Sequence, residues 1–410
     1  MRNKPRIRFK GFTEDWEQRK LGDLLILLKD GSHGTHKNTD EGVYLLSAKN
    51  IKNGRINIMP DDRIISWEDY DVIHKNYELQ LGDILLTIVG SIGSTAIFNL
   101  KTKVTFQRSV AFLRPNSDLN NGFLYTLINT DRFQNQLQTK QVVSAQPGIY
   151  LGDLASIDIT YPKNLSEQEK IYSIFKEIED SITLHQRKLE KLKLAKKAFL
   201  QKLFPKNGSQ FPEIRFKGFT DAWEQRKLGE YANFRRGSFP QPYGNKEWYD
   251  GVGSAPFVQV VDVGDNLSLV DYTKQRISKL AQPMSVYAEK GSVLVTLQGS
   301  IGRVAVSQYD AFIDRTILIF QGYKYKTNSY FWAYIIKNKF SEEALKAPGG
   351  TIKTITKEAL SNFIILYPKF SEQEQIGSFF EKLDKLITLH QRKLDKLQEV
   401  KKGLLQKMFV

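Results

Sequence analysis

Residues 166–204 read SEQEKIYSIFKEIEDSITLHQRKLEKLKLAKKAFLQKLF, and residues 371–409 read SEQEQIGSFFEKLDKLITLHQRKLDKLQEVKKGLLQKMF. The two stretches lie 205 residues apart, and 23 of their 39 positions are identical. Self-similarity at so long a period indicates a duplicated domain rather than a solenoid, because solenoid repeats run only to about 50 residues.

Apolar residues within each stretch recur at alternating steps of three and four, which is the spacing of a coiled-coil seam. The seam residues are Phe175, Ile178, Ile182, His185, Leu189 and Leu192 in the first stretch and Phe380, Leu383, Ile387, His390, Leu394 and Leu397 in the second. His185 and His390 occupy the same seam position, as do Lys196 and Lys401 further along, and polar seam residues fix register at a cost in stability. If the two halves pair about a pseudo-two-fold axis, the two long helices run antiparallel.

Each stretch also opens with the pattern Ser-x-x-Glu shortly after a proline, at Ser166 and Glu169 and again at Ser371 and Glu374. In a capping box the serine accepts a hydrogen bond from a free backbone N–H, and the glutamate reaches back to the N–H of the serine. The pattern therefore predicts that these serines cap the two long helices.

A second repeat lies at the start of each half. IRFKGFTEDWEQRKLG begins at Ile7 and IRFKGFTDAWEQRKLG begins at Ile214, and 14 of the 16 positions are identical. In contrast, residues 30–160 and 237–366 barely resemble each other. The duplication therefore predicts two domains of one fold whose middle segments have diverged.

The divergent segments have the pattern of mixed α/β structure. Apolar, β-branched runs at residues 84–89 and 293–297 suggest strands, and helical patterns occur at residues 123–138 and 330–345. We therefore predict an α+β protein, in which two similar mixed α/β domains are separated by two long antiparallel coiled-coil helices with pseudo-two-fold symmetry. The predicted parts are residues 1–160, 161–206, 207–366 and 367–410, with a turn-rich linker at residues 205–212.

The composition favours a polyanionic partner. The chain carries 60 Lys plus Arg against 45 Asp plus Glu, which gives a net charge of +15. The absence of cysteine removes disulfides, thiolate metal ligands and cysteine nucleophiles. The N-terminal MRNKPRIRFKGF lacks the apolar core of a signal peptide, and no apolar run is long enough to cross a bilayer. We therefore expect a cytoplasmic protein that does not contact membranes.

Polar loops in the divergent segments supply candidate DNA contacts, because Arg, Lys, Gln and Asn read base edges while Ser, Thr and backbone N–H groups hold phosphates. The candidates are Lys29, Ser32, His33, His36, Lys49, Asn50, Ser91, Arg108 and Gln146 in the first half, and Arg235, Arg236, Gln259, Gln298, Ser300, Arg303, Arg315, Thr351 and Lys353 in the second. For any single one of these residues the favoured interpretation is an ordinary solvated loop position, and DNA contact is expected of the domain surfaces as a whole.

Motifs for catalysis and metal binding are missing from the sequence. It contains no GxxxxGK[ST] phosphate loop, no GxGxxG after a strand and no Asn-Pro-Pro-aromatic tetrapeptide, the motif by which amino-methyltransferases hold their target base. His33 and His36 form an H-x-x-H pair without further ligands nearby, and His185 and His390 are expected to set the seam register. We predict no catalytic residue and no metal site.

This layout resembles the specificity subunit of type I restriction–modification enzymes, and most of all the staphylococcal-like subunits of low-GC Gram-positive bacteria. The resemblance covers the whole chain. It rests on the RFKGFT…WEQRKLG segments that begin at Arg8 and Arg215, on the two SEQE-initiated helices, and on the turns at residues 90–93 and 299–302, which both read GSIG.

The resemblance implies that each divergent domain is a target recognition domain for one half of a bipartite, asymmetric site in double-stranded DNA. It implies that the helices set the half-site spacing and dock two modification subunits, which carry the adenine-N6 methyltransferase chemistry and S-adenosylmethionine. Restriction subunits supply ATP- and Mg²⁺-dependent activity. The chain itself then needs no cofactor and catalyses no reaction.

The seam also gives an expected length. Residues 175–203 span about 43 Å at about 1.5 Å per residue, which is a little over one turn of B-DNA and predicts half-site centres roughly 10–13 bp apart. Two other interpretations stay open. A single-chain DNA methyltransferase or nuclease with an unrecognised active site needs a cofactor fold, and a coiled-coil adaptor that contacts only proteins shows no salt-dependent DNA binding.

Overall fold

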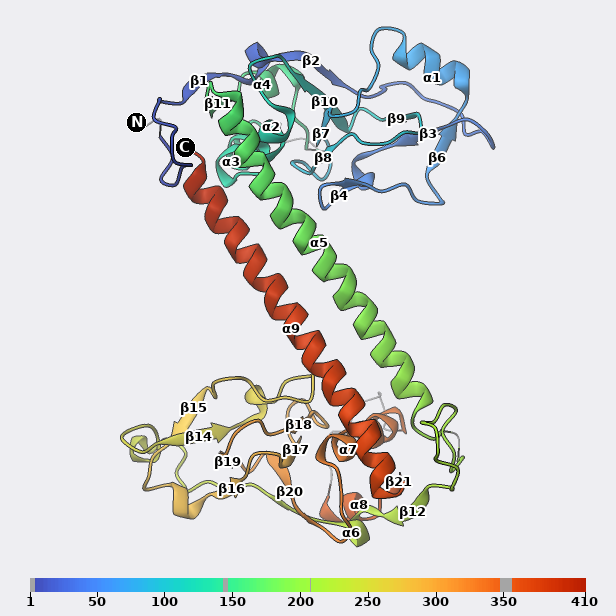
Figure 1. Cartoon of the computed structure of the whole chain (residues 1–410), viewed down its shortest axis with the longest axis vertical. Helices are drawn as coiled ribbons and strands as arrows, with labels where there is room; N and C mark the ends of the chain where they lie inside the picture. Colours follow the sequence, from blue (N-terminus) through green and yellow to red (C-terminus); the bar gives the residue numbers. More distant parts are fainter. Residues whose placement is uncertain (1–3, 143–146, 207, 347–355) are drawn as a thin grey trace. The chain divides into compact units, whose positions relative to one another are not determined.

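The structure is a computed structural model that describes residues 4–142, 147–206, 208–346 and 356–410. It divides into two compact units: unit 1 comprises Met1–His185 and Lys393–Val410, and unit 2 comprises Gln186–Arg392. The boundaries fall inside two long helices, α5 (Leu165–Lys202) and α9 (Phe370–Met408), so each helix contributes one end to each unit (Figure 1).

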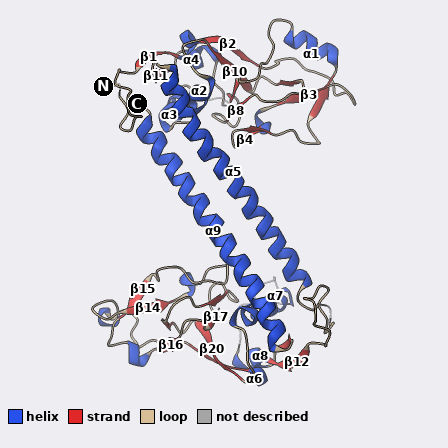
Figure 2. Ribbon diagram, in the orientation of Figure 1, coloured by secondary structure: helices blue, strands red, loops and turns tan. Residues whose placement is uncertain are grey.

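Unit 1 combines short strands with helices, as Figure 2 shows. Its strands are β1 (Glu17–Lys20), β2 (Leu25–Asp30), β3 (Val43–Leu46), β4 (Ile51–Lys52), β5 (Arg55–Ile56), β6 (Arg63–Ile65), β7 (Ile84–Thr87), β8 (Thr95–Ile97), β9 (Val104–Phe106), β10 (Val110–Pro115) and β11 (Asp158–Tyr161). Its other helices are α1 (Trp67–His74), α2 (Asn121–Ile128), α3 (Asp131–Thr139) and α4 (Leu151–Ala155), with 3₁₀ turns η1 (Leu21–Leu24) and η2 (Ala48–Asn50).

Unit 2 is built in the same way. Its strands are β12 (Glu224–Lys227), β13 (Ala232–Arg236), β14 (Ala255–Val258), β15 (Gln275–Ile277), β16 (Val286–Ala288), β17 (Val293–Thr296), β18 (Val304–Val306), β19 (Ala311–Ile313), β20 (Ile317–Tyr323) and β21 (Ile364–Tyr367). Its other helices are α6 (Leu228–Tyr231), α7 (Ser329–Lys346) and α8 (Lys357–Ser361), with 3₁₀ turns η3 (Lys246–Trp248), η4 (Val260–Asp262) and η5 (Gln282–Met284).

The central sheets of the two units share one strand order, while the second sheet of unit 2 has one more strand than that of unit 1. A central four-stranded sheet has the order β2-β10-β7-β8 in unit 1 and β13-β20-β17-β18 in unit 2. A second sheet, β6-β3-β9 or β15-β14-β19-β16, contains one parallel pair, β3 with β9 or β14 with β19. A two-stranded sheet, β1-β11 or β12-β21, joins the start of each half to the strand before its long helix. The mixed α+β class predicted from the sequence is confirmed.

Each main core is completed by the end of a long helix from the other half of the chain. In unit 1, Met408 belongs to the buried cluster around Trp16 and Phe175, and Phe409 packs against it. In unit 2, Leu203 and Phe204 join the cluster around Trp223 and Phe380. Because burying an aromatic or aliphatic side chain stabilises a fold by about 1.5–3 kcal/mol, these contacts anchor the helix ends.

The two long helices run antiparallel within each unit. In unit 1, the rings of Phe175 and Phe409 lie 6.0 Å apart, and Glu179 contacts Lys401. In unit 2, the rings of Phe199 and Phe379 lie 5.0 Å apart, and Lys196 contacts Asp384. Residues with rising numbers along α5 contact residues with falling numbers in and just after α9, as antiparallel pairing requires.

The predicted seam residues lie along these contacts with unequal burial. Buried positions are Phe175, His185, Leu189, Phe380, Leu383 and Leu394, and partly buried positions are Ile178, Ile182, Leu192, Ile387, His390 and Leu397.

The predicted capping boxes are not formed. Helix α5 begins at Leu165, one residue before Ser166, so Ser166 lies inside the helix. Oδ1 of Asn164 accepts a hydrogen bond from Ser166 N at 2.9 Å. Helix α9 begins at Phe370, so Ser371 already lies inside it. The acidic residue that matters is Glu167, whose buried carboxylate accepts two hydrogen bonds from Arg8, at 2.6 and 2.8 Å.

Unit 2 repeats this ion pair between Arg215 and Glu372, with both distances 2.7 Å. The pairing raises the pKa of Arg215, as it does for Arg8, mainly through the side-chain hydrogen bond. The repeated RFKGFT segment is therefore held against the start of each long helix by a bidentate arginine–carboxylate pair.

The helical pattern at residues 123–138 is interrupted. Helix α2 ends at Ile128, and α3 begins at Asp131 after Thr130, whose Oγ1 accepts from Phe133 N at 3.3 Å. A threonine cap at this point satisfies a free N–H and starts a new helix. The pattern at residues 330–345 corresponds to α7, and the runs at residues 84–89 and 293–297 contain β7 and β17.

Candidate nucleic-acid interface

A short turn in unit 1 presents Arg108 between β9 and β10. Val110 N donates to Gln107 O at 3.1 Å and closes the turn. Ser32 fixes it from the side, because Ser32 N donates to Phe106 O at 2.8 Å and Arg108 N donates to Ser32 O at 2.9 Å. The backbone around Arg108 is therefore pinned, while its side chain is exposed.

The approach of the β2 end to this turn requires glycine. A Cβ on Gly31 would lie 2.1 Å from the carbonyl oxygen of Phe106 and 2.4 Å from that of Gln107. Both atoms are backbone, so neither can move aside without breaking the turn.

Two further segments with predicted contacts meet the same turn. Gln107 N donates to Leu46 O at 2.8 Å, and Ala48 N donates to Ser109 Oγ at 3.0 Å, which brings η2 and Lys49 alongside. Ile88 N donates to Ser109 O at 2.9 Å, which holds the end of β7 against the Arg108 turn. The GSIG turn that carries Ser91 comes directly after this segment. The structure thus gathers Ser32, Lys49, Ser91 and Arg108 around one set of strand ends.

Lys49 and Asn50 differ in their access to solvent. Lys49 is exposed, and its Nζ lies 2.8 Å from Oδ1 of Asp62. Asn50 is fully buried, and its Nδ2 donates to Asp62 Oδ2 at 2.6 Å and to Asn57 O at 2.8 Å. Burial raises the pKa of Asp62, but Lys49 and the N–H of Met59 outweigh it, so the net pKa is lowered. Asp62 therefore stays ionised and fixes η2.

The residues after β2 are held by local contacts. Nε2 of His33 lies 2.6 Å from Oδ2 of Asp30. His36 contacts Ser32 Oγ through Nε2 at 2.6 Å and Asp69 Oδ1 through Nδ1 at 3.2 Å. The two histidines thus face different partners and tie this loop to β2 and α1, instead of converging on a metal ion. Among the described residues, no group of three or more His, Asp or Glu side chains is arranged to hold a metal.

Lys29 and Ser91 complete the placements in unit 1. Nζ of Lys29 lies 4.3 Å from the ring centre of Tyr77, a cation–π contact that keeps the side chain beside the sheet. Ser91 is exposed, and its carbonyl oxygen accepts from Thr87 Oγ1 at 2.5 Å. Gln146 lies outside the described residues.

Unit 2 presents Arg315 on a turn between β19 and β20. Ile317 N donates to Asp314 O at 2.9 Å and closes this turn. A Cβ on Gly237 would lie 2.2 Å from the carbonyl oxygen of Ile313, so here too the neighbouring strand end requires glycine. Arg315 is exposed, and its guanidinium carbon lies 4.9 Å from the ring centre of Tyr243.

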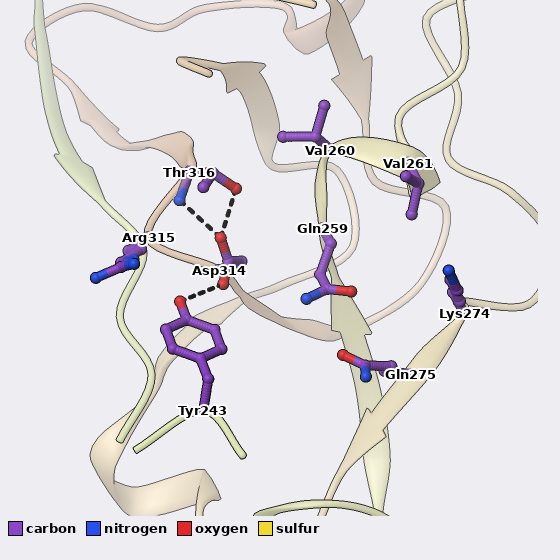
Figure 3. Close-up of a pocket in the computed structure, with 9 residues that line it drawn as sticks. All are labelled: Tyr243, Gln259, Val260, Val261, Lys274, Gln275, Asp314, Arg315 and Thr316. Carbon is purple, nitrogen blue, oxygen red and sulfur yellow. Dashed lines mark hydrogen bonds between the residues drawn. The ribbon is translucent and has the colours of Figure 1, made fainter. Parts of the chain in front are cut away.

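Beside Arg315 lies a hollow of about 400 Å³, which we call the Arg315 hollow (Figure 3). It is lined by Tyr243, Gln259, Val260, Val261, Lys274, Gln275, Asp314, Arg315 and Thr316. Asp314 is buried and accepts from Tyr243 Oη at 2.6 Å, from Thr316 N at 2.8 Å and from Thr316 Oγ1. Burial, together with the bond to Asp314, raises the pKa of Tyr243, so the phenol stays protonated and remains a donor.

The other predicted residues of unit 2 lie on neighbouring segments. Arg235 and Arg236 are exposed on β13, and Gln298 and Ser300 are exposed in the turn after β17. Nε of Arg303 lies 3.0 Å from Oδ1 of Asp265, so this cation is already paired. Thr351 and Lys353 lie outside the described residues.

Of the residues that line the Arg315 hollow, Gln259 and Arg315 were predicted from the sequence, and the polar residues that were missed include Tyr243, Lys274 and Gln275. Tyr243 comes from a loop, Lys274 directly precedes β15 and Gln275 begins it, and all three lie 40 to 72 positions from Arg315 in the chain. Their residue types gave a weak signal, but nothing local in the sequence placed them beside that arginine.

A sequence profile of the type I restriction modification DNA specificity domain matches the chain twice, over residues 13–194 and 220–399. The putative type I restriction enzyme MjaX specificity subunit of Methanocaldococcus jannaschii is 24% identical over 404 residues, which cover 96% of this chain and 92% of that protein. The type I restriction enzyme MjaVIII specificity subunit of the same organism is 22% identical, with 96% and 91% covered.

Among solved structures, the crystal structure of a type I restriction-modification system S subunit from M. genitalium matches with a TM-score of 0.69. The match covers 99% of both chains at 17% sequence identity, which shows a common fold. No helix in the described part of the chain is long and apolar enough to cross a membrane.

Proposed function

Since the chain belongs to the family of type I restriction–modification DNA specificity domains and carries that domain twice, we propose that it recognises a bipartite, asymmetric DNA site for a type I restriction–modification complex. The recognition domain at residues 1–160 reads one half-site, and the domain at residues 207–366 reads the other.

One observation carries this proposal: two units with the same central sheet present several different side chains at corresponding strand ends. A common frame allows both domains to approach a duplex in the same way, and different side chains select different bases. The net charge of +15 supplies the attraction to phosphates that gives salt-dependent, sequence-independent affinity.

The reaction belongs to partner subunits. The relatives that match this chain over most of its length are named specificity subunits. The chain therefore supplies sequence recognition, while two modification subunits bring S-adenosylmethionine and adenine methylation. Restriction subunits bring ATP- and Mg²⁺-dependent activity, and the complex acts on DNA in the cytoplasm.

The two spacer helices, residues 161–206 and 367–410, offer surface to those partners. Leu184 and Leu389 stand at equivalent positions of the repeat and are 51% and 60% exposed. Leu194, 70% exposed, adds a further apolar position. Apolar side chains exposed on a charged helix are typical of surfaces that pack against helical partners. The same helices set the distance between half-sites.

Methylome sequencing tests the proposal. The chain is expressed together with a modification subunit in a host that lacks DNA methylation, and modified adenines are mapped. One methylated motif with two unlike specific halves and an unspecific gap is expected. Modification without such a motif, or none at all, contradicts the proposal. Binding of S-adenosylmethionine by this chain alone favours a single-chain methyltransferase, and absence of salt-dependent DNA binding by the complex favours a protein-binding adaptor.

A further inference from the structure

The two arginine turns share five corresponding backbone hydrogen bonds, although the surrounding sequences barely resemble each other. The corresponding donor–acceptor pairs, unit 1 first, are Gly31 N–Val110 O and Gly237 N–Ile317 O, Ser32 N–Phe106 O and Ser238 N–Ile313 O, Gln107 N–Leu46 O and Asp314 N–Val258 O, Ile88 N–Ser109 O and Leu297 N–Thr316 O, and Val110 N–Gln107 O and Ile317 N–Asp314 O. Arg108 and Arg315 therefore occupy the same position in the two units.

The positions around the two arginines differ. Ser47 follows β3 where Gln259 follows β14, and Arg63 begins β6 where Gln275 begins β15. The chemistry also changes within the turns, where Gln107 and Ser109 of unit 1 correspond to Asp314 and Thr316 of unit 2. The arginine is thus shared by the two surfaces, as are a serine after the first strand (Ser32 and Ser238) and a serine in the GSIG turn (Ser91 and Ser300), whereas the positions named above differ.

DNA presents one constant feature and one variable feature to such a pair of surfaces. The phosphate backbone is the same at every sequence, whereas the pattern of donors and acceptors on the base edges changes with each base pair. A side chain common to two readers of different half-sites fits the constant feature, and side chains that differ between them fit the variable one.

We propose that Arg108 and Arg315 are equivalent phosphate anchors, one for each half-site, and that Gln275, in the Arg315 hollow, reads a base of the half-site bound by unit 2. This inference rests on the proposed function. It assigns separate roles within each recognition surface: a fixed cation positions the domain on the backbone, and the neighbouring side chains select the sequence.

The surroundings of the two arginines suit an anchor. Each lies on a pinned turn, so little backbone entropy is lost when a phosphate is bound. Neither guanidinium forms an ion pair with another described residue. The ring of Tyr243 stacks against Arg315. Tyr243 Oη and Thr316 N donate hydrogen bonds to the carboxylate oxygens of Asp314. The arginine charge is therefore available to an external anion.

Gln275 suits a base contact. Its side chain points into the Arg315 hollow, as Figure 3 shows, and its amide makes no hydrogen bond with another residue in the described ranges. A free carboxamide can pair in bidentate fashion with N6 and N7 of adenine. The structural counterpart of Gln275, Arg63, is instead engaged in unit 1, where Nε donates to Asn38 Oδ1 at 2.8 Å.

The experiment compares five variants of the full chain, each assembled with a modification subunit: Arg108→Ala, Arg315→Ala, Gln275→Ala, and the controls Lys20→Ala and Lys227→Ala. Lys20 and Lys227 are exposed at equivalent positions of β1 and β12, and in Figure 1 β12 lies on the other side of unit 2 from β14 and β15. Each control removes one positive charge from the same unit. The readouts are the methylated motif and the dependence of DNA affinity on salt concentration.

We expect Arg108→Ala and Arg315→Ala to keep the wild-type motif. Each should lose about tenfold in affinity at 0.1 M salt, for cognate and unrelated DNA alike, and reduce the slope of log affinity against log salt by about 1. The lysine controls should change that slope much less. Gln275→Ala should leave the slope unchanged and make one position of a single half-site degenerate, without altering the other half.

The outcomes separate this inference from the proposed function. A changed or relaxed motif in Arg315→Ala, or an unchanged salt slope in both arginine variants, overturns the anchor role. A wild-type motif in Gln275→Ala overturns the base contact. Should an alanine variant fail to assemble, Arg315→Gln removes the charge but keeps a long polar side chain, and Gln275→Met keeps a similar side-chain volume without the amide; both are read in the same way. A wild-type complex that yields no bipartite motif counts against the proposed function instead.

Discussion

Lys196 of α5 and Asp384 of α9 form an ion pair in unit 2, with Nζ 2.5 Å from Oδ1. The repeat places the same pair in unit 1, where Lys401 Nζ lies 2.7 Å from Oε1 of Glu179. A tyrosine reaches each acid: Tyr334 Oη donates to Asp384 at 2.5 Å, and Tyr125 Oη lies 3.4 Å from Glu179. The lysines that interrupt the seam thus form ion pairs between α5 and α9. The acid of each pair also contacts a tyrosine of a third helix, α7 in unit 2 and α2 in unit 1.

Removal of these lysines should affect the two units unequally. The Lys196 and Asp384 side chains are only 15% and 9% exposed, whereas those of Lys401 and Glu179 are 28% and 29% exposed. We expect Lys196→Ala to lower the free energy of unfolding of unit 2 by about 3 kcal/mol, because it leaves a buried carboxylate without its cation. Lys401→Ala should cost unit 1 about 1 kcal/mol, because its pair is more hydrated. Urea denaturation of both variants measures this, and equal losses would contradict the ranking.

The two long helices could be predicted from the sequence, but their N-terminal caps could not. Steps of three and four were sufficient to predict two long antiparallel helices, because burial along one stripe dominates helix pairing. The capping prediction was wrong for α5 because Asn164, one position before the helix, was the better cap. The acid that is held near this helix start is Glu167, which Arg8 reaches from 159 positions away. A tertiary partner of that kind leaves no mark in the local pattern.

Gly122 and Tyr172 form a small-against-large contact between α2 and α5. A Cβ on Gly122 would lie 2.3 Å from ring carbon Cδ1 of Tyr172. Alanine normally stabilises a helix relative to glycine by up to about 1 kcal/mol, yet here we expect Gly122→Ala to destabilise unit 1 by about 1–3 kcal/mol through overpacking.

Two further variants make this test specific. Gly152 of α4 has open space around its Cβ position, so Gly152→Ala should be neutral or stabilising. Tyr172→Gly should relieve the penalty of Gly122→Ala, although it removes packing of its own. Additive effects in a double-mutant cycle by urea denaturation would show that the two residues do not compete for space.

His74 should make the stability of unit 1 depend on pH. Its ring stacks on Tyr70 at 4.3 Å, and Nε2 lies 3.0 Å from Thr105 Oγ1. Burial lowers the pKa of His74 below its ordinary value of about 6.5. The unfolded chain therefore takes up the proton first as pH falls, and the free energy of unfolding declines below about pH 6.5, by at most about 1.4 kcal/mol per pH unit.

Comparison of the wild type with His74→Gln between pH 5 and 8 measures this contribution. The variant should lose part of the acid-side decline in unfolding free energy, whatever its stability at pH 8. Parallel pH profiles for the two proteins would show that His74 titrates alike in both states.

The spacer role of the helices predicts a change in half-site distance. Deletion of seven residues from each helix, 183–189 and 388–394, keeps the three-four register of the seam. It removes about 10 Å of helix, which corresponds to about 3 bp of duplex. Methylome sequencing should show the same two half-sites with a gap about 3 bp shorter. An unchanged gap would show that the length of the helices does not set the distance between half-sites.

The recognition surface was less accessible to sequence reasoning than the helices. Residue type alone could not tell that Asn50 is buried at the end of η2 while Arg108 is exposed, because an amide serves equally well inside a loop and against a base. The Arg315 hollow joins side chains from separate strands and loops, and only their pairing in space brings Gln275 and Tyr243 to Arg315. The DNA contacts of the predicted residues stay a prediction.

The central claim is that each unit reads its own half-site from a common frame, and a chain with two copies of one reader tests it. The core residues that pack against each recognition segment correspond closely in the two units. Trp16, Phe175 and Phe409 of unit 1 match Trp223, Phe380 and Phe204 of unit 2. One exception needs adjustment, since Tyr172 corresponds to Gly377, where a Cβ would lie 2.0 Å from Asn328 Oδ1.

The decisive measurement is the methylome of a host that expresses a modification subunit and a hybrid chain, in which residues 236–366 replace residues 30–160 and Tyr172 is changed to Gly. Antiparallel helices should present the two identical readers in opposite directions. The expected methylated motif is therefore an inverted repeat of the half-site that the wild-type chain reads through unit 2. A motif that keeps the other half-site, or one in which the same half-site recurs as a direct repeat, would contradict the account.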